Sequence, residues 1–219
     1  FAVFLTDIRK DYDEAEKLFR SAINDNTNDS GHLVNFAVFL TDIRKDYDEA
    51  EKLYRRAIEA DPNAAIHLGN FANFMLQVRK NHDKAEKLYR RAIEADPNNA
   101  NILGNFAGMQ LGRGLVEHGL ALLQQAMALQ PSEDDLMAEI NFYALAHWPA
   151  QWTTALSEMR GLIGRGVRSP WWDLSANCRQ ARLDGHAQPE FLETLALVIA
   201  DQAPESALQP FPCWHPDAP

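Results

Sequence analysis

Four asparagines recur at matching places in the sequence, and their side-chain amides are the groups best suited to bind another molecule. Each stands immediately before a phenylalanine, and the pairs are Asn35-Phe36, Asn70-Phe71, Asn105-Phe106 and Asn141-Phe142. An amide offers two donors and one acceptor oxygen, so it can bond the N–H and the C=O of an extended peptide together. This spacing predicts a surface that binds peptide backbone and tolerates many side-chain sequences.

Catalytic chemistry has no comparable pattern in the chain. The seven histidines are scattered, and there is no HExxH motif, phosphate-binding loop or nucleophile elbow. Cys178 and Cys213 do not have a metal-binding spacing, and two thiols in 219 residues imply no disulfide framework. We therefore predict that the chain is not an enzyme and has no catalytic residues, no metal ion and no cofactor.

An internal repeat of thirty-five residues positions the asparagines. The run Phe1–Leu18 (FAVFLTDIRKDYDEAEKL) reappears letter for letter at Phe36–Leu53, and a looser copy starts at Phe71. Each repeat holds two apolar stripes at three- and four-residue steps, which predict two amphipathic helices. In one repeat these stripes are Leu33, Phe36, Ala37, Leu40 and Ile43, then Ala50, Leu53, Tyr54, Ala57 and Ile58. Units of this length cannot bury an apolar surface alone, so they must stack on their neighbours.

The ends of the second helix are marked by polar residues and proline. Asp48 precedes the second stripe and is expected to act as the N-cap, with Glu51 three residues on as a capping-box partner. Asp61-Pro62 is expected to end the helix, because proline cannot donate to the helical hydrogen bonds and disfavours helical geometry in the preceding residue.

These second helices resemble the tetratricopeptide repeat (TPR) family. The small, aromatic, small and proline positions of that family are matched in order and spacing by Ala50, Tyr54, Ala57 and Pro62, and again by Ala85, Tyr89, Ala92 and Pro97. The resemblance implies an all-α fold, an α-solenoid in which antiparallel helix pairs form a right-handed superhelix. The chain departs from the usual thirty-four residues by one, near Thr41–Lys45 and Leu76–Lys80, where we expect the helix end to lengthen or bulge without changing the stack.

Three segments follow from composition. Residues 1–131 are predicted to be TPR repeats, the first one truncated; residues 132–202 diverged helical repeats and a C-terminal cap; and residues 203–219 an irregular, proline-rich tail. All five tryptophans lie beyond Pro131, where twelve acidic residues stand against five arginines. The tryptophan-rich part is either a cap of the stack or a docking surface for another domain or subunit.

The predicted binding surface lies opposite the buried side of each first helix. At about 100° per residue, Asn70 and Asn73 point away from Leu68, Phe71 and Met75. In a TPR stack that side lines the concave groove, which we predict from Asn35, Asn70, Asn73, Asn105, Asn141, Val34, Val38 and Ile66. The arrangement resembles the asparagine ladders of peptide-binding TPR domains, including the one fused to a protein O-glycosyltransferase. Asparagine at this position can instead bond between adjacent helices, and both interpretations stay open.

Two functions follow from the resemblance. The first is a protein–protein interaction module that holds a peptide or protein segment in the groove; the alternative is the non-catalytic, substrate-recruiting arm of a larger enzyme, such as a TPR-fused glycosyltransferase. A basic surface suited to nucleic acid is lacking, and no apolar run is long enough to span a bilayer. We expect a protein or peptide partner, no nucleic acid, no membrane and a cytoplasmic location. Because Phe1 corresponds to Phe36, part-way along a helix, we also expect the array to extend upstream, and self-association through this open repeat is a further hypothesis.

Overall fold

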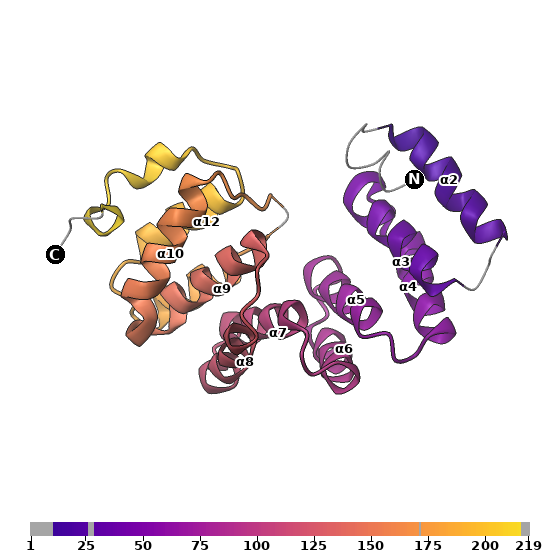
Figure 1. Ribbon diagram of the computed structural model, residues 1–219, viewed down its shortest axis with the longest axis horizontal. Helices are drawn as coiled ribbons and strands as arrows, with labels where there is room; N and C mark the ends of the chain where they lie inside the picture. Colours follow the sequence, from indigo (N-terminus) through magenta and orange to yellow (C-terminus); the bar gives the residue numbers. More distant parts are fainter. Residues whose placement is uncertain (1–10, 26–28, 171, 216–219) are drawn as a thin grey trace. The chain divides into compact units, whose positions relative to one another are not determined.

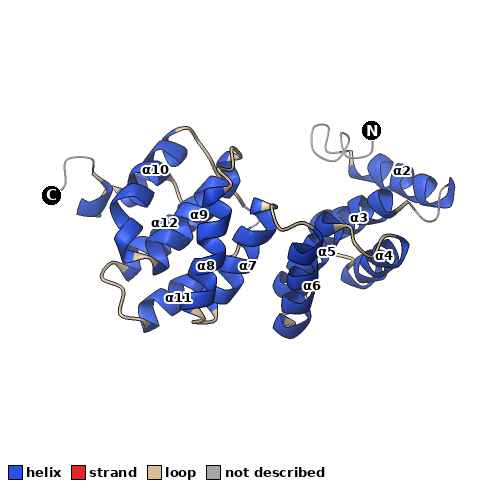
Figure 2. Cartoon of the chain, turned by 60° about the horizontal axis from the view of Figure 1, so that its bottom comes forward, coloured by secondary structure: helices blue, strands red, loops and turns tan. Residues whose placement is uncertain are grey.

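The computed structural model describes residues 11–25, 29–170 and 172–215, and within them every regular element is a helix (Figures 1 and 2). The chain divides into two compact units, residues 1–97 and 98–219. The first unit holds α2 (Tyr12–Asp25), α3 (Ser30–Phe39), the π-helical turn η2 (Leu40–Arg44), α4 (Tyr47–Ala60), α5 (Ala65–Gln77) and α6 (His82–Ala95). The second holds α7 (Ala100–Gly112), α8 (Val116–Ala128), α9 (Asp134–His147), α10 (Trp152–Gly164), α11 (Ser175–Leu183) and α12 (Pro189–Ile199).

The predicted all-α architecture of stacked helix pairs is confirmed. In the first unit α3 pairs with α4 and α5 pairs with α6, while α2 packs on α3, α4 packs on α5, and α3 touches α5 (Figure 1). Residues 1–10, where the sequence predicts the first helix of the truncated repeat, lie outside the described residues, and so does the hypothesis of self-association. Within the described residues no helix is both long enough and apolar enough to cross a membrane.

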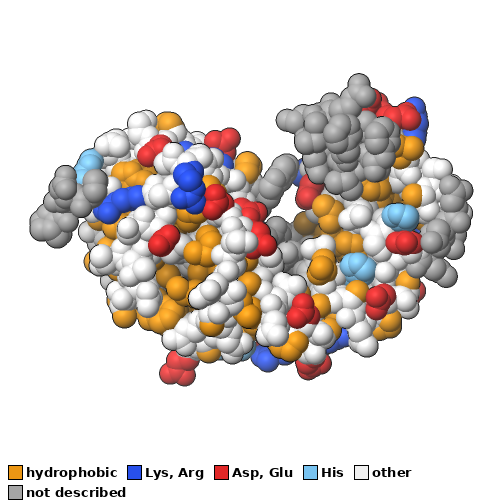
Figure 3. Space-filling view, in the orientation of Figure 1, with side chains coloured by type: hydrophobic (Ala, Val, Ile, Leu, Met, Phe, Trp, Pro, Cys, Tyr) orange, Lys and Arg blue, Asp and Glu red, His pale blue; other side chains and the backbone are white. Residues whose placement is uncertain are grey.

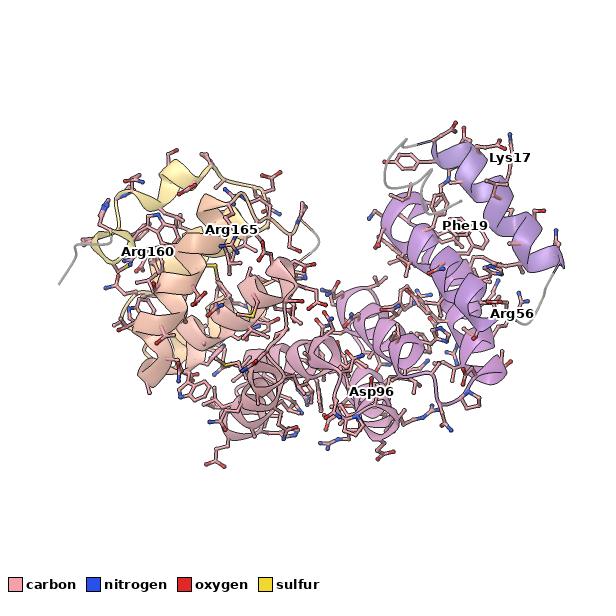
Figure 4. All side chains as sticks on the ribbon, viewed as in Figure 1. Lys17, Phe19, Arg56, Asp96, Arg160 and Arg165 are labelled. Atoms are coloured by element: carbon pink, nitrogen blue, oxygen red, sulfur yellow. The ribbon has the colours of Figure 1, made fainter. Side chains whose placement is uncertain are left out.

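A cluster of three aromatic rings joins each repeat of the first unit to the next. Phe19 on α2 points toward α3 (Figure 4), where its ring stacks on Phe36 with centroids 5.4 Å apart and meets Phe39 at 5.3 Å. All three rings are buried. Each ring therefore removes a large apolar area from water, and contact between the rings adds about 0.5–1.5 kcal/mol for each well-oriented pair.

The next junction repeats this cluster with different residues. Tyr54 on α4 lies 5.3 Å from the ring of Phe71 and 5.3 Å from the ring of Phe74, both on α5. A ring from the second helix of one repeat is thus inserted between two phenylalanines from the first helix of the following repeat. Because Phe71 and Phe74 are nearly one turn apart, this contact fixes both the rotation and the height of α5.

An arginine clasp accompanies each aromatic cluster. Arg79, just after α5, donates to Asp48 Oδ1 at 2.6 Å and to Glu51 Oε2 at 2.7 Å on α4. Its guanidinium also lies 5.6 Å from the ring of Phe74. Arg44 repeats these contacts one unit earlier, with Asp13, Glu16 and Phe39 as its partners. Each clasp ties the end of one repeat's first helix to the second helix of the repeat before it.

The predicted N-cap of α4 was wrong, and the arginine clasp explains why. The N-cap of α4 is Asp46, whose side chain accepts from the backbone N–H of Glu49, and not Asp48. Asn81 caps α6 in the same way through the N–H of Lys84. The prediction was wrong because Asp48 already lies inside the first helical turn, and its carboxylate is held by an arginine thirty-one residues away.

The thirty-fifth residue of the repeat lies where the sequence predicted it. At the end of α3 the helix widens into η2, and Lys45 then adopts a left-handed conformation with φ 59°. The backbone N–H of Asp46 bonds Leu40 O, six residues back, at 3.1 Å. Lys80 closes α5 with φ 53° in the same manner. The extra residue is absorbed as a bulge at the helix end.

The second unit is built around α9. This helix contacts α7, α8, α10, α11 and α12, and its residues from Ala138 to His147 are all buried. The C-terminal segment packs onto this unit through Leu208 and Trp214, both buried, and Arg160 on α10 donates to the carbonyl oxygens of Trp214 and His215 at 2.9 Å (Figure 4). Three other tryptophans, Trp148, Trp152 and Trp172, are half-buried, and Trp171 lies outside the described residues.

Removal of the ring of Tyr54 tests the aromatic cluster. We expect Tyr54→Ala to lower the free energy of unfolding by about 3–5 kcal/mol, because it leaves a cavity between α4 and α5. Tyr54→Phe is the matched control: Phe19 already fills this position in a nearly identical repeat, so the loss is expected to stay below about 1 kcal/mol. Urea unfolding followed by circular dichroism measures both, and equal losses would contradict the packing role of the ring.

Candidate functional site

The predicted groove residues gather on two neighbouring helices of the first unit. Asn35 on α3 is exposed, and Ile66 on α5 has 62% of its surface open to solvent. Val38 on α3 and Asn70 on α5 are half-buried. We call these four residues the amide surface. Because α3 and α5 touch, the surface is continuous across two repeats.

Burial of the adjacent phenylalanines turns these amides outward. Phe36 and Phe71 are 2% and 3% exposed, and each lies one helical step after its asparagine. A step of about 100° therefore keeps the preceding side chain off the buried side. Within the described part of the chain, the side-chain amides of Asn35 and Asn70 form no hydrogen bond to another residue, and neither does that of the half-buried Asn105 on α7 of the second unit. Among the described residues, none of these three side chains bonds to an adjacent helix.

Three other predicted residues lie elsewhere. Val34 is 3% exposed and belongs to the core, and Asn141 is also buried, with Nδ2 donating to Met137 O one turn earlier at 2.8 Å. Asn73 is half-buried, and its Oδ1 accepts from the hydroxyl of Tyr89 within the same repeat. These side chains are engaged inside the protein, so we leave them out of the amide surface.

Asp42 is a residue that the sequence analysis missed. It lies in η2, four residues after Val38, and is half-buried without a hydrogen bond or ion pair to any described residue. Burial raises the pKa of its carboxyl group, and the charge of Lys45 opposes that effect. The sequence could have indicated Asp42, because this residue lies on the same helical stripe as Asn35 and Val38.

In the second unit, close packing covers part of α7, the helix that corresponds to α5 in the repeat. Along α7 a glycine occurs every fourth residue, at Gly104, Gly108 and Gly112. A Cβ atom on Gly108 would overlap the ring of Tyr143 from α9, and one on Gly112 would lie 3.1 Å from Ala176 Cβ of α11. The missing side chains thus let α9 and α11 approach α7 closely. Where the first unit has Asn73, the second has Gly108 beneath another side chain.

Asn177 fixes α11 against this helix. Its Nδ2 donates to Gly108 O at 3.2 Å, and its Oδ1 lies 2.9 Å from Nε2 of His147, at the end of α9. All three residues are buried, so the amide satisfies one backbone carbonyl and one imidazole in the interior. The repeat pattern predicts no contact between α11 and α7, although the repeated glycines of α7 could have indicated one.

A carboxylic acid is buried beside the same contact. Glu139 on α9 is 5% exposed, and the hydroxyl of Tyr143 donates to its Oε1 at 2.6 Å. Burial raises the pKa of Glu139 from its ordinary value of 4.5 to about 7, although the Tyr143 hydrogen bond lowers it. The group is therefore largely neutral at slightly acidic pH, and ionisation above neutrality places a charge in the interior.

Stacked helical hairpins with a regular thirty-five-residue period define an α-helical repeat protein, and part of the chain is similar to the tetratricopeptide repeat family. A family model described as "Tetratricopeptide repeat" matches residues 44–100, and one described as "Sel1 repeat" matches residues 5–26. No curated protein sequence matches the chain significantly.

Solved structures share the fold. PilW, described as a widely conserved type IV pilus biogenesis factor, is 18% identical over 95% of this chain and 94% of its own, with a TM-score of 0.67. YrrB, described as a TPR protein with an unusual peptide-binding site, is 21% identical over 87% of each chain, with a TM-score of 0.52. PilF of Pseudomonas aeruginosa is 16% identical over 80% of this chain and 76% of its own, at 0.50. At these identities the likeness shows the fold alone.

Substitution of Gly108 tests the close packing in the second unit. Gly108→Ala must displace Tyr143, so we expect it to destabilise the fold by about 1–3 kcal/mol despite the better helix propensity of alanine. Gly164→Ala is the control, since a Cβ atom there meets nothing within 4 Å, and it is expected to be neutral or slightly stabilising. Thermal unfolding compares the two, and an equally stable Gly108→Ala variant would contradict the contact.

The pKa of Glu139 predicts a pH dependence of stability. Because the folded-state pKa is raised, the protonated carboxyl group stabilises the fold fully below pH 4.5, and this contribution is lost as the pH rises through about 7. Glu139→Gln keeps a neutral group of similar shape. We expect the difference in unfolding free energy between the two proteins to change by on the order of 2–3 kcal/mol between pH 4.5 and 8. Urea unfolding across this range measures it, and a constant difference would refute the assignment.

Proposed function

We propose that the chain is a protein-interaction module that holds an extended peptide segment on the amide surface of the first unit. The observation that carries this proposal is the pair of outward amides, Asn35 and Asn70, which lie on touching helices without hydrogen-bond partners among the described residues. An unpaired amide at a surface keeps both its donors and its acceptor for a ligand.

The geometry of helix packing suits the proposed ligand. Packed helices lie about 8–10 Å apart, and an extended chain advances about 3.3 Å for each residue. Equivalent amides on α3 and α5 therefore meet a crossing peptide at every third residue or so. Each amide donates to a peptide C=O and accepts from a peptide N–H, while Val38 and Ile66 supply apolar contacts between them. Affinity then comes mainly from the peptide backbone.

Two further observations support the proposal and limit its extent. YrrB, which shares the fold, is described as having a peptide-binding site, so a peptide ligand suits this architecture. In the second unit the position that corresponds to Asn73 is Gly108, which lies against Tyr143 and Asn177. We therefore assign the peptide to the first unit and not to the equivalent part of α7.

Removing both amides tests the proposed ligand contacts. Peptides that bind the intact chain are first selected from a displayed random library, and their affinity is then measured by fluorescence anisotropy. We expect Asn35→Ala combined with Asn70→Ala to weaken binding about 10- to 100-fold, since each amide contributes about 0.5–1.5 kcal/mol. Melting temperature should barely change, because neither side chain bonds another described residue.

Two controls make this test decisive. Asn24→Ala combined with Asn101→Ala removes two exposed helical amides outside the amide surface and is expected to leave affinity unchanged. Methylation of peptide backbone nitrogens facing the two asparagines should weaken binding as strongly as the double substitution. If N-methylated peptides bind normally, or if the double variant melts far below the intact chain, the amides do not bind peptide backbone.

A further inference from the structure

The second unit contains a pocket that the proposed peptide surface does not use. Its volume is about 800 Å³, within the range of ligand-binding cavities, and it lies where the turn between α11 and α12 faces the end of α9 and the start of α10. Side chains of Val116, Ala146 and Ala181 form an apolar wall. Polar and aromatic groups gather on the remaining sides.

Helix dipoles do not determine which charge this pocket prefers. The C-terminal ends of α9 and α11 line it, and so do Val116 and Trp152, the first residues of α8 and α10, and Gln188, which precedes α12. The negative ends of two helices and the positive ends of three others thus meet at one cavity, and their partial charges offset one another in part. The preference therefore depends on the side chains.

Two imidazoles of the pocket are neutral and oriented by hydrogen bonds. His186 Nε2 donates to Leu145 O at 3.0 Å, and its Nδ1 accepts from the N–H of Gln188 at 3.1 Å. His147 Nε2 donates to Asn177 Oδ1, because the Asn177 amide nitrogen already donates to Gly108 O. Burial lowers the pKa of both rings. The Nδ1 atom of His147 is therefore an acceptor, without a hydrogen bond to any described residue.

The remaining groups favour a cation. Among the described lining residues, Asp184 has the one carboxylic side chain, and none of them is a lysine or an arginine. Trp152 adds an indole ring, which is held by His186 at 5.3 Å and Phe191 at 6.0 Å between ring centroids. The unit as a whole has thirteen acidic residues against six arginines. A carboxylate beside an aromatic ring, in an acidic unit, is the environment in which a cationic group is bound.

We propose that this pocket is a second binding site, which takes an arginine side chain presented by a polypeptide partner. The guanidinium stacks on the Trp152 indole, donates to the Asp184 carboxylate and reaches the free Nδ1 of His147. Its aliphatic stem lies against Val116 and Ala181. A volume of about 800 Å³ exceeds one side chain, so residues that flank the arginine enter as well.

Arginine fits these groups better than lysine for a physical reason. Its planar guanidinium stacks on an indole and presents several N–H donors in fixed directions, whereas an ammonium is a compact and strongly hydrated charge. The carboxylate and the imidazole acceptor are separate groups, and a forked donor can bond both. The histidines do not repel the ligand because both are neutral at pH 7.

Isothermal titration at pH 7.5 tests the site with two capped pentapeptides, Gly-Ala-Arg-Ala-Gly and the same peptide with citrulline in place of arginine. Citrulline keeps the shape of arginine but is uncharged. We expect the arginine peptide to bind at least 10-fold more tightly than the citrulline peptide. In NMR spectra it should shift the ring signals of His147 and His186, and Asp184→Asn should remove most of the difference between the peptides.

Asp201→Asn is the matched control, because Asp201 is an exposed aspartate of the same unit outside the pocket and its loss changes the net charge equally. It is expected to leave arginine binding unchanged. Equal binding of the two peptides, no binding at millimolar concentration, or equal effects of the two aspartate variants would overturn the proposal. The site is independent of the amide surface, so the double alanine variant of Asn35 and Asn70 should bind the arginine peptide normally whether or not the proposed function holds.

Discussion

One kind of contact sets how each repeat of the first unit meets the next: an aromatic ring of one repeat is inserted between two phenylalanines of the following one. Tyr54 makes this contact with Phe71 and Phe74, and it fixes the rotation of α5. Asn70 stands directly before Phe71, so the same rotation that buries the ring brings the amide to the surface. The proposed peptide contacts are therefore a consequence of core packing, and a change in the aromatic cluster would move the amides as well.

Local features of the sequence predicted much of this fold, but they did not predict contacts between residues that are far apart in the chain. The repeat period and the apolar stripes gave the helices, and the thirty-fifth residue was expected at the helix end, where η2 is found. Asp48 was wrongly expected to cap α4. Its partner, Arg79, is thirty-one residues away in the next repeat, and no pattern within one repeat distinguishes a capping carboxylate from one held by a neighbouring repeat.

In the candidate site, too, local patterns predicted some positions, whereas contacts between distant residues were not predicted. Asn35 and Asn70 lie outside the buried side of their helices, because the buried residues that set this side are local to each helix. Asn141 is buried because α9 contacts five other helices, and that arrangement depends on α11 returning to α7, where Asn177 bonds a carbonyl sixty-nine residues earlier. A repeat pattern describes contacts between successive hairpins, so it carries no information about a helix that packs out of order.

The two units use the same repeat position in different ways. A half-buried asparagine side chain on α5 of the first unit is replaced on α7 of the second by Gly108, whose missing Cβ leaves room for Tyr143 and exposes its carbonyl to Asn177. Burying α9 on all sides then requires that its polar groups find partners inside, which Glu139 does with Tyr143 and His147 with Asn177. The bond to Asn177 uses one nitrogen of His147, and the same residue lines the pocket at the helix ends. The packing that covers α7 in this unit is thus accompanied by a pocket at the helix ends, where a different kind of site is proposed.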